Sequence, residues 1–283
     1  MDLLSPGGSL VTTDWLAERL GHPDLIVLDA SVGAHRGTAE RIPGAQVFDI
    51  DGAMSDATSP LPHTMPDLDV FGRALRALGL NDRSFVVAYD AAGIYSSARA
   101  WWMLRAAGFD RAAVLDGGLP AWKAADLGCE PASAPTGSRA TGDFTAKPRP
   151  ELLADSAAVT AVLADDAWAV LDARSRERYT GQVAEPRPGL RRGHMPGAAN
   201  LPFTDLQVDG RMRASDELRA LFAAAVGPRE RLVFSCGSGV TACVLALGAD
   251  LAGYRDLAVY DGSWSEWGLM SDLPVETSSQ AIG

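Results

Sequence analysis

Residues 232–241 read Leu-Val-Phe-Ser-Cys-Gly-Ser-Gly-Val-Thr and join an apolar run to an amphipathic one through a loop that contains Cys236. The apolar run is typical of a buried strand, and the residues from Thr241 onward have helical spacing. Glycines on both sides of Ser238 allow the backbone to curl so that several N–H groups point inward. These donors and the start of the helix favour an anion. We therefore expect Cys236 to be a reactive thiolate, rather than a cysteine that packs as a small hydrophobe.

Two other functions use a similar loop between a strand and a helix. Residues 237–242 match the G-x-G-x-x-A fingerprint of dinucleotide-binding domains, but too few residues follow them to complete such a domain. Cysteine phosphatases close their loop with an arginine that grips the phosphate, and Ala242 stands at that position. The loop has no cation of its own, so it suits a sulfur atom better than a phosphate group.

Three short motifs in the first half of the sequence recur in the same order in the second half. Two copies of one domain of about 130 residues explain this, and domains of this size are common. The related pairs are Ile-Val-Leu-Asp-Ala at 26–30 with Ala-Val-Leu-Asp-Ala at 169–173, Ile-Pro-Gly-Ala at 42–45 with Met-Pro-Gly-Ala at 195–198, and Val-Leu-Asp-Gly-Gly at 114–118 with Val-Tyr-Asp-Gly-Ser at 259–263.

A segment rich in Pro, Gly, Ser and Thr separates the copies, which is linker composition. We predict one domain over residues 1–134, a linker over 135–144 and a second domain over 145–283. Strand-like runs are expected at 25–28, 85–89, 112–115, 169–171, 232–234 and 258–260. Amphipathic helical stretches are expected at 13–20, 70–78, 96–107, 156–163, 215–226 and 241–251. This alternation predicts an α/β fold in which each copy is a mostly parallel sheet with helices on both faces, and ligands bind at the carboxyl ends of its strands.

Composition excludes several classes of partner. The net charge of −11 argues against nucleic acid and anionic membranes. Three cysteines are too few for a disulfide framework, and the four histidines are scattered, so we expect no metal and no cofactor. The N-terminus has neither the basic nor the apolar region of a secretory signal, and no apolar run is long enough to span a bilayer. A cytoplasmic protein is expected.

Beyond these patterns, four motifs resemble the tandem-domain rhodanese superfamily, and within it the 3-mercaptopyruvate sulfurtransferase branch. They are Cys-Gly-Ser-Gly-Val-Thr at 236–241, Glu-Pro-Arg at 185–187, Gly-His-Met-Pro-Gly-Ala at 193–198 and Tyr-Asp-Gly-Ser-Trp at 260–264. The resemblance covers both copies. In the thiosulfate-using branch of this superfamily, the corresponding loop reads Cys-Arg-Lys-Gly-Val-Thr. In this sequence Gly237 and Ser238 replace that Arg-Lys pair.

The resemblance implies roles for residues around Cys236. Arg178 and Arg187 would bind the carboxylate and carbonyl of the donor. The loop residues Gly237, Gly239, Val240 and Thr241 would hold the sulfur. The other arginines nearby (Arg174, Arg176, Arg191 and Arg192) are expected only to tune the local potential.

Residues of the first copy are also implicated by the resemblance. His63 and Asp51 would assist Ser238 in proton transfer, and Asp56 could take the place of Asp51. Alternatively, His63 is an exposed loop histidine without this role. The first copy carries Asp90 where Cys236 is expected, so we predict that it is catalytically inactive.

The function that the resemblance implies is transfer of a sulfane sulfur from 3-mercaptopyruvate, through a Cys236 persulfide, to a thiol or cyanide, with release of pyruvate. Reduced thioredoxin is a possible acceptor. Two alternatives remain open: a thiosulfate:cyanide sulfurtransferase, and a non-catalytic sulfur-carrier or regulatory module.

Overall fold

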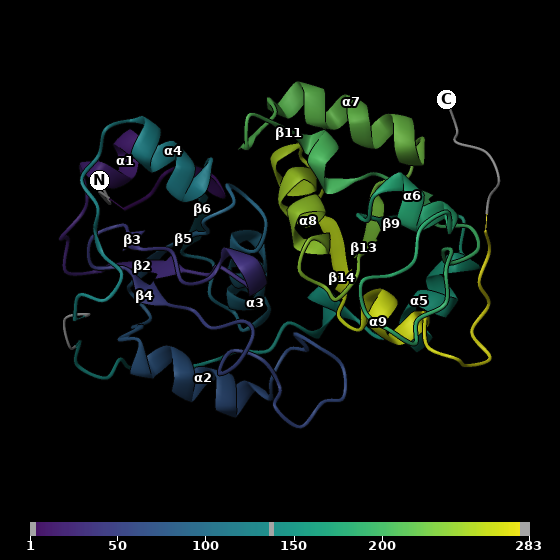
Figure 1. The fold of residues 1–283 in the computed structure, drawn as a ribbon, viewed down its shortest axis with the longest axis horizontal. Coiled ribbons are helices and arrows are strands. Elements are labelled where there is room, and N and C mark those ends of the chain that lie inside the picture. Colours follow the sequence, from purple (N-terminus) through teal and green to yellow (C-terminus); the bar gives the residue numbers. More distant parts are fainter. Residues whose placement is uncertain (1–3, 136–138, 278–283) are drawn as a thin grey trace. The chain divides into compact units, whose positions relative to one another are not determined.

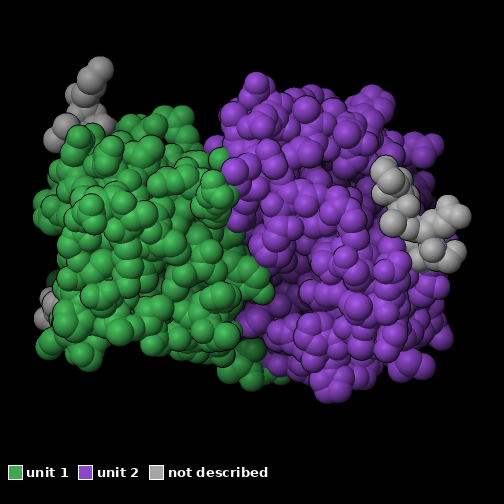
Figure 2. Space-filling model, turned by 45° about the horizontal axis from the view of Figure 1, so that its top comes forward, with its two compact units in different colours: residues 1–58, 65–149, 209–212 green, residues 59–64, 150–208, 213–283 purple. Residues whose placement is uncertain are grey.

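The computed structural model describes residues 4–135 and 139–277. Outside this part lie residues 1–3 of the first predicted domain, residues 136–138 of the predicted linker and residues 278–283 of the second predicted domain. The described chain forms two compact units (Figure 2). Unit 1 takes the residues up to Thr58, Met65–Arg149 and Asp209–Met212. Unit 2 takes Ser59–Thr64, Pro150–Val208 and the residues from Arg213 onward. Each unit therefore includes a short segment from the other half of the sequence.

Unit 1 is built on a five-stranded parallel sheet with the order β1-β6-β5-β2-β4 (Figure 1). Its strands are β1 (Leu10–Val11), β2 (Leu25–Asp29), β4 (Gln46–Val47), β5 (Phe85–Tyr89) and β6 (Ala112–Leu115). Its helices are α1 (Thr13–Ala17), α2 (Leu68–Ala77), α3 (Ser97–Ala106) and α4 (Gly118–Ala124). The short strands β3 (Glu40–Arg41) and β7 (Glu130–Pro131) pair in an antiparallel ribbon, and Gly33–His35 forms a 3-10 turn, η1.

Unit 2 repeats this sheet with the order β10-β9-β13-β14-β8, again parallel throughout. Its strands are β8 (Leu153–Ala154), β9 (Trp168–Asp172), β10 (Ala199–Asn200), β13 (Arg231–Ser235) and β14 (Asp256–Tyr260). Its helices are α5 (Ser156–Leu163), α6 (Arg176–Thr180), α7 (Ser215–Val226), α8 (Ala242–Leu251) and α9 (Ser263–Trp267). Short additions are η2 (Pro150–Leu152), η3 (Phe203–Leu206) and the two-stranded ribbon of β11 (Gln207–Val208) and β12 (Arg211–Met212).

Both faces of each sheet are covered, as the predicted fold class requires. In unit 2, Val233 packs in one core cluster with Val159 of α5 and Trp264 of α9. Phe234 is the next residue of the strand and points to the opposite face. There it contacts Phe222 of α7, with ring centroids 6.3 Å apart. Consecutive strand residues, which point to opposite faces of the sheet, are therefore both buried. This explains why the strands read as continuous apolar runs.

The strand order supports a common origin for the two halves. The strand β5 lies between β6 and β2, and β13 lies between β14 and β9. The loop after β5 and the loop after β13 are thus equivalent positions on two copies of one sheet. The first contains Asp90 and the second contains Cys236.

The helix expected at 13–20 is shorter in the structure. The helix α1 ends at Ala17, and residues 18–21 form turns that finish at Gly21 with a φ of +84°. Glycine adopts this left-handed backbone conformation without steric cost. The chain leaves the helix at the C-cap Glu18, and Gly21 closes the turns that follow.

Residues 139–149, part of which the composition assigns to a linker, pack against unit 1. Phe144 is buried and contacts Phe109 edge to face at 5.5 Å, and its N–H donates to Leu80 O at 3.1 Å. Gly142 donates its N–H to Arg76 O at 2.8 Å. A Pro, Gly, Ser and Thr composition indicates a lack of helix and strand, and it does not exclude fixed packing.

Replacing Gly142 with alanine is expected to lower the free energy of unfolding by about 1–3 kcal/mol, the usual effect of a steric clash. A Cβ at this position would lie 1.9 Å from Leu80 O, which is a backbone atom that cannot move aside. Gly128→Ala is the matched control, because nothing lies within 4 Å of its Cβ position. Chemical denaturation of both variants measures the difference. Equal stability would show that residues 139–149 do not pack in this way.

Candidate active site

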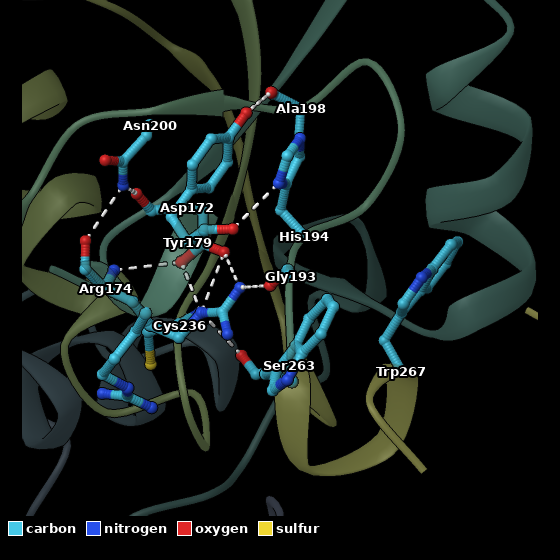
Figure 3. A network of polar contacts seen from close by, with 12 residues as sticks. Asp172, Arg174, Tyr179, Gly193, His194, Ala198, Asn200, Cys236, Ser263 and Trp267 are labelled. Atoms are coloured by element: carbon cyan, nitrogen blue, oxygen red, sulfur yellow. Dashed lines mark hydrogen bonds and ion pairs between the residues drawn. The ribbon is translucent and has the colours of Figure 1, made fainter. Parts of the chain in front are cut away.

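Cys236 follows the last residue of β13, at the carboxyl end of the sheet, and is 1% exposed. The hydroxyl of Ser263, at the start of α9, accepts two hydrogen bonds from its loop. The N–H of Cys236 donates to Ser263 Oγ at 3.1 Å, and the N–H of Gly239 donates at 3.0 Å. Figure 3 shows the first of these bonds beside the cysteine sulfur. The loop is therefore held at both ends by one side chain.

The carbonyl groups of the loop are bound by the same helix. Trp264 N–H donates to Cys236 O at 2.9 Å. Ser265 donates both its N–H, at 2.9 Å, and its hydroxyl, at 2.6 Å, to Gly237 O. These buried backbone groups are thereby satisfied within the protein, as stable folds require. The support from Ser263 and Ser265 escaped the sequence analysis, although the motif pair Asp-Gly-Gly at 116–118 and Asp-Gly-Ser at 261–263 was a signal for it.

Arg178 lies beside the cysteine loop. It belongs to α6, whose first residue follows the N-cap Ser175. Its Nη2 would lie 3.1 Å from a Cβ built on Gly237, the residue after the cysteine. The cation missing from the loop sequence is thus supplied by α6. The absence of a side chain at Gly237 leaves room for this guanidinium group.

Glu185 holds Arg178 in place. Its carboxylate accepts from Arg178 Nε at 3.2 Å and from Nη2 at 2.5 Å, and it also accepts from Arg174 Nη1 at 2.8 Å. The Glu185 side chain is 2% exposed, whereas that of Arg178 is 26% exposed. One buried carboxylate therefore bridges two guanidinium groups, and Arg178 still reaches solvent.

Arg174 is buried at the centre of this network and does more than tune the local potential. Its side chain pairs with Asp172 (Figure 3). Its guanidinium group stacks over Trp264, 4.1 Å from the ring centroid. Desolvation lowers the pKa of Arg174, but the ion pairs with Asp172 and Glu185 outweigh it, so the net shift is upward. The guanidinium group therefore stays charged, as buried arginines with two carboxylate partners do.

The remaining members of the predicted site occupy varied positions. Arg187 is exposed, two residues beyond the anchored Glu185. In the loop, Val240 and Thr241 are buried, and Gly239 has a φ of +75° that favours glycine.

His63 contacts the cysteine loop. The segment Ser59–Thr64 groups with unit 2, and His63 Nδ1 lies 2.9 Å from Ser238 Oγ. A backbone φ of +62° at His63 is unusual for a residue other than glycine, so the surrounding contacts hold it there. The structure thus brings together two of the three residues predicted to transfer protons.

The two aspartates proposed to assist His63 have partners in unit 1. Asp51 accepts from the N–H of Gly33 at 2.7 Å and pairs with Arg36 at 3.4 Å. Asp56 accepts from the N–H and hydroxyl of Thr58 at 2.8 and 2.7 Å. Participation of either aspartate in proton transfer stays a prediction.

The equivalent loop of the first copy contains an anion. Asp90 is fully buried, and its carboxylate accepts four backbone N–H groups. Ala92 donates to one oxygen at 2.9 Å, and residues 95–97 donate to the other at 2.8–2.9 Å. A loop at this position of the sheet can therefore surround a negative charge with N–H donors. The loop after β13, which contains Cys236, is the equivalent position in the second copy.

Other titratable and thiol groups of the chain have structural surroundings. The ring of His194 stacks on Tyr179 at 3.8 Å, and its Nδ1 lies 2.8 Å from Tyr179 O. Burial raises the pKa of Tyr179 to about 12, so its hydroxyl stays protonated and donates to Ala198 O. Cys243 is buried in α8, and Cys129 is partly buried. Among the described residues, no group of His, Cys, Asp and Glu has the arrangement of a metal site, and no helix could span a membrane.

Comparison with known proteins gives the class to which this fold and site belong. A family model described as the rhodanese-like domain matches residues 12–125 and again residues 156–269. The chain therefore belongs to the rhodanese-like family, with two tandem domains.

Individual relatives define the class further. The 3-mercaptopyruvate sulfurtransferases of Escherichia coli K12 and Homo sapiens are each 40% identical to this chain; the alignments cover 94% and 97% of this chain and 97% and 96% of those proteins. The crystal structure of SseA from Escherichia coli, titled as a 3-mercaptopyruvate sulfotransferase, matches with a TM-score of 0.80 and 37% identity, over 92% of this chain and all of that one. The chain is accordingly a sulfurtransferase.

Replacing Glu185 with glutamine is expected to lower the free energy of unfolding by about 3–5 kcal/mol, the cost of removing one partner from a buried ion pair. The Arg174 side chain is fully buried and would lose one of its two anionic partners. Glu230→Gln is the control, because Glu230 makes an ion pair with Arg219 at the surface. Denaturation curves of both variants test this. Equal losses would show that the Glu185 network does not stabilise the fold.

Proposed function

We propose that this sulfurtransferase takes its sulfur from 3-mercaptopyruvate and carries it as a persulfide on Cys236. One observation supports this most strongly: the two residues after Cys236 are each paired with a chemically suitable side chain. The Arg178 guanidinium group lies against Gly237, and His63 contacts the hydroxyl of Ser238. A cation and a proton-transfer pair thus flank the nucleophile. The Escherichia coli and human relatives named after this donor agree with the choice.

The arginines would bind the carboxylate and carbonyl groups of the donor. The positive charge of Arg178 is already partly balanced by the carboxylate of Glu185. Its exposed edge therefore offers a ligand hydrogen-bond donors more than an uncompensated charge. Arg187 is exposed and can provide the second guanidinium fork. Such planar forks suit a carboxylate with an adjacent ketone. Both would also stabilise the enolate that forms during sulfur transfer.

The first half-reaction would proceed by attack of the Cys236 thiolate on the thiol sulfur of the donor. A bond forms between the two sulfur atoms, and the bond from the donor sulfur to carbon breaks. The electron pair of that bond stays on carbon, which gives the enolate of pyruvate. The products are a Cys236 persulfide and, after proton transfer, pyruvate.

The proton needed by the enolate carbon is the one carried by the donor thiol. We assign its transfer to Ser238 and His63. Their side chains are 2.9 Å apart, and Ser238 follows the nucleophile Cys236 by two residues. A serine hydroxyl can donate and accept at once, and a histidine titrates near neutral pH. Asp51 is the proposed further partner. The persulfide is left as an anion, so atoms and charge balance.

The second half-reaction would return the cysteine to its starting state. A nucleophile such as cyanide, a small thiol or reduced thioredoxin attacks the outer sulfur, and Cys236 leaves as the thiolate. The loop residues Gly237, Gly239, Val240 and Thr241 would hold this sulfur and favour its departure. The cycle uses only the residues named and requires no cofactor. We place the protein in the cytoplasm, where such thiols are present.

The two halves of the chain would have unequal roles in this function. We propose that residues 1–134 form an inactive copy and that residues 145–283, after a linker over 135–144, form the catalytic one. Asp90 supports this division, because a carboxylate in place of the thiol cannot accept sulfur. The catalytic copy also includes His63 among its contacts, so it does not work with its own half of the sequence alone.

Cys236→Ser is expected to abolish sulfur uptake, because a serine hydroxyl cannot form a persulfide. Intact-mass measurement after addition of 3-mercaptopyruvate should show one extra sulfur atom on the wild type and none on the variant. Cys243→Ser is the control, since this thiol lies within α8, and it should take up sulfur as the wild type does. Sulfur uptake by Cys236→Ser would refute the assignment.

The same experiment distinguishes the alternative functions. Thiosulfate as a preferred donor would replace 3-mercaptopyruvate in the proposal; a relative from Arabidopsis thaliana, 36% identical over 97% of this chain and 79% of its own, is named for both donors. No sulfur uptake from either donor would indicate a non-catalytic module. The Arg178 group beside Gly237 favours 3-mercaptopyruvate, because an arginine side chain at position 237 would collide with it.

Arg187→Lys is expected to raise the KM for 3-mercaptopyruvate about tenfold or more, because a bidentate fork is replaced by a point charge. Arg192→Lys, another arginine of the same region, is the control and should change little. Steady-state kinetics with cyanide as acceptor measure both variants. Unchanged kinetics for Arg187→Lys would remove this residue from the donor site.

A further inference from the structure

Ser263 has an unusual backbone conformation for a serine. Its φ is +48°, in the left-handed region that favours glycine, and the residue is fully buried. The equivalent residue of the first copy is Gly118, with a φ of +54°. A glycine therefore meets the same backbone requirement in the copy without a thiol. The serine in the catalytic copy is strained, so its hydroxyl must contribute something that glycine does not.

The hydroxyl of Ser263 has a defined orientation. It donates its proton to Tyr260 O at 2.8 Å. Both lone pairs are therefore left to accept, and they bind the N–H groups of Cys236 and Gly239. These two donors enclose Gly237 and Ser238, the residues that contact Arg178 and His63. Ser263 thus controls the shape of the part of the loop on which the proposed chemistry depends.

In the two copies, different groups accept the N–H groups of the loop that follows the central strand. In the first copy the Asp90 carboxylate lies inside the loop and collects its N–H groups. A Cβ on Gly118 would lie 2.4 Å from Asp90 O and 2.3 Å from Gly93 O, so that loop approaches the glycine directly. In the second copy the residue inside the loop must stay free to react. The organising contact then comes from outside the loop, from Ser263.

We propose that Ser263 is a positioning residue for sulfur transfer: its hydroxyl fixes the turn from Cys236 to Gly239, so that the remaining loop N–H groups face the sulfur. The proposal rests on the proposed function of Cys236 as the sulfur carrier. It assigns Ser263 no contact with the donor. The serine is required in the catalytic copy because the sulfur, unlike the Asp90 carboxylate, cannot both organise the loop and attack a substrate.

The test is the rate at which iodoacetamide alkylates Cys236 as a function of pH, followed on the Cys236 peptide by mass spectrometry. Ser263→Gly should move the midpoint of this profile to higher pH by about one unit, which makes alkylation about tenfold slower below the midpoint. Glycine tolerates the backbone conformation, so the variant should keep the wild-type circular dichroism and unfolding temperature. Ser263→Ala removes the hydroxyl without relieving the strain and should shift the profile in the same way.

Asp126→Gly is the matched control, because Asp126 is exposed, has a φ of +53° and lies in unit 1. It relieves the same kind of strain without touching the loop, and its profile should match the wild type. A wild-type profile for Ser263→Gly would overturn the proposal, and so would an equal shift in Asp126→Gly. Alkylation needs no sulfur donor. If the wild type fails to take up sulfur from 3-mercaptopyruvate, the donor assignment fails while the alkylation profiles still decide the role of Ser263.

Discussion

The backbone N–H groups at the carboxyl end of the central strand need acceptors, and both halves of the molecule are organised around this requirement. A parallel strand that turns sharply into a helix leaves several donors pointing at one spot in a buried loop, where unpaired donors are costly. In the first copy the spot is filled by the Asp90 carboxylate. In the second copy the loop contains Cys236, and the Ser263 hydroxyl accepts the N–H groups of Cys236 and Gly239. The two copies therefore differ in which group meets this requirement.

The ionic network below the loop connects it to the core of unit 2. Glu185 bridges Arg174 and Arg178, and Arg174 stacks on Trp264, whose N–H holds Cys236 O. Two cations and two anions, including Asp172, are gathered with no net charge, which is how several charged groups can be buried together. Because each partner also makes a directional hydrogen bond, Arg178 is held against the loop in one position. The entropy cost of ordering this long side chain is therefore already met within the fold.

Most of the fold was predictable from the sequence because the evidence was local. Buried parallel strands are continuous apolar runs, and the repeated motifs at strand ends required two sheets of the same order. Cys236 could be selected from its loop sequence, and Arg178 from the resemblance to the tandem-domain rhodanese superfamily. Glu185 and Ser263 could not, since their importance comes from contacts that only the folded chain makes: Ser263 binds a loop 24 and 27 residues away along the chain. A glutamate among arginines reads as a solvated surface residue, and the linker composition of residues 139–144 gave no sign that Phe144 is buried.

The relation between Gly237 and Arg178 shows why the loop sequence and the arginine have to be considered together. A side chain at position 237 would meet Arg178 Nη2 at its first carbon, so a large residue there requires Arg178 to move. Arg178 cannot move without leaving Glu185, which would then keep only Arg174 as a partner in a buried place. A loop that carried its own cation at 237 would therefore weaken the network that supports it. The glycine and the arginine therefore depend on each other: the positive charge beside the loop comes from Arg178 of α6, which Glu185 holds in place, and not from the loop itself.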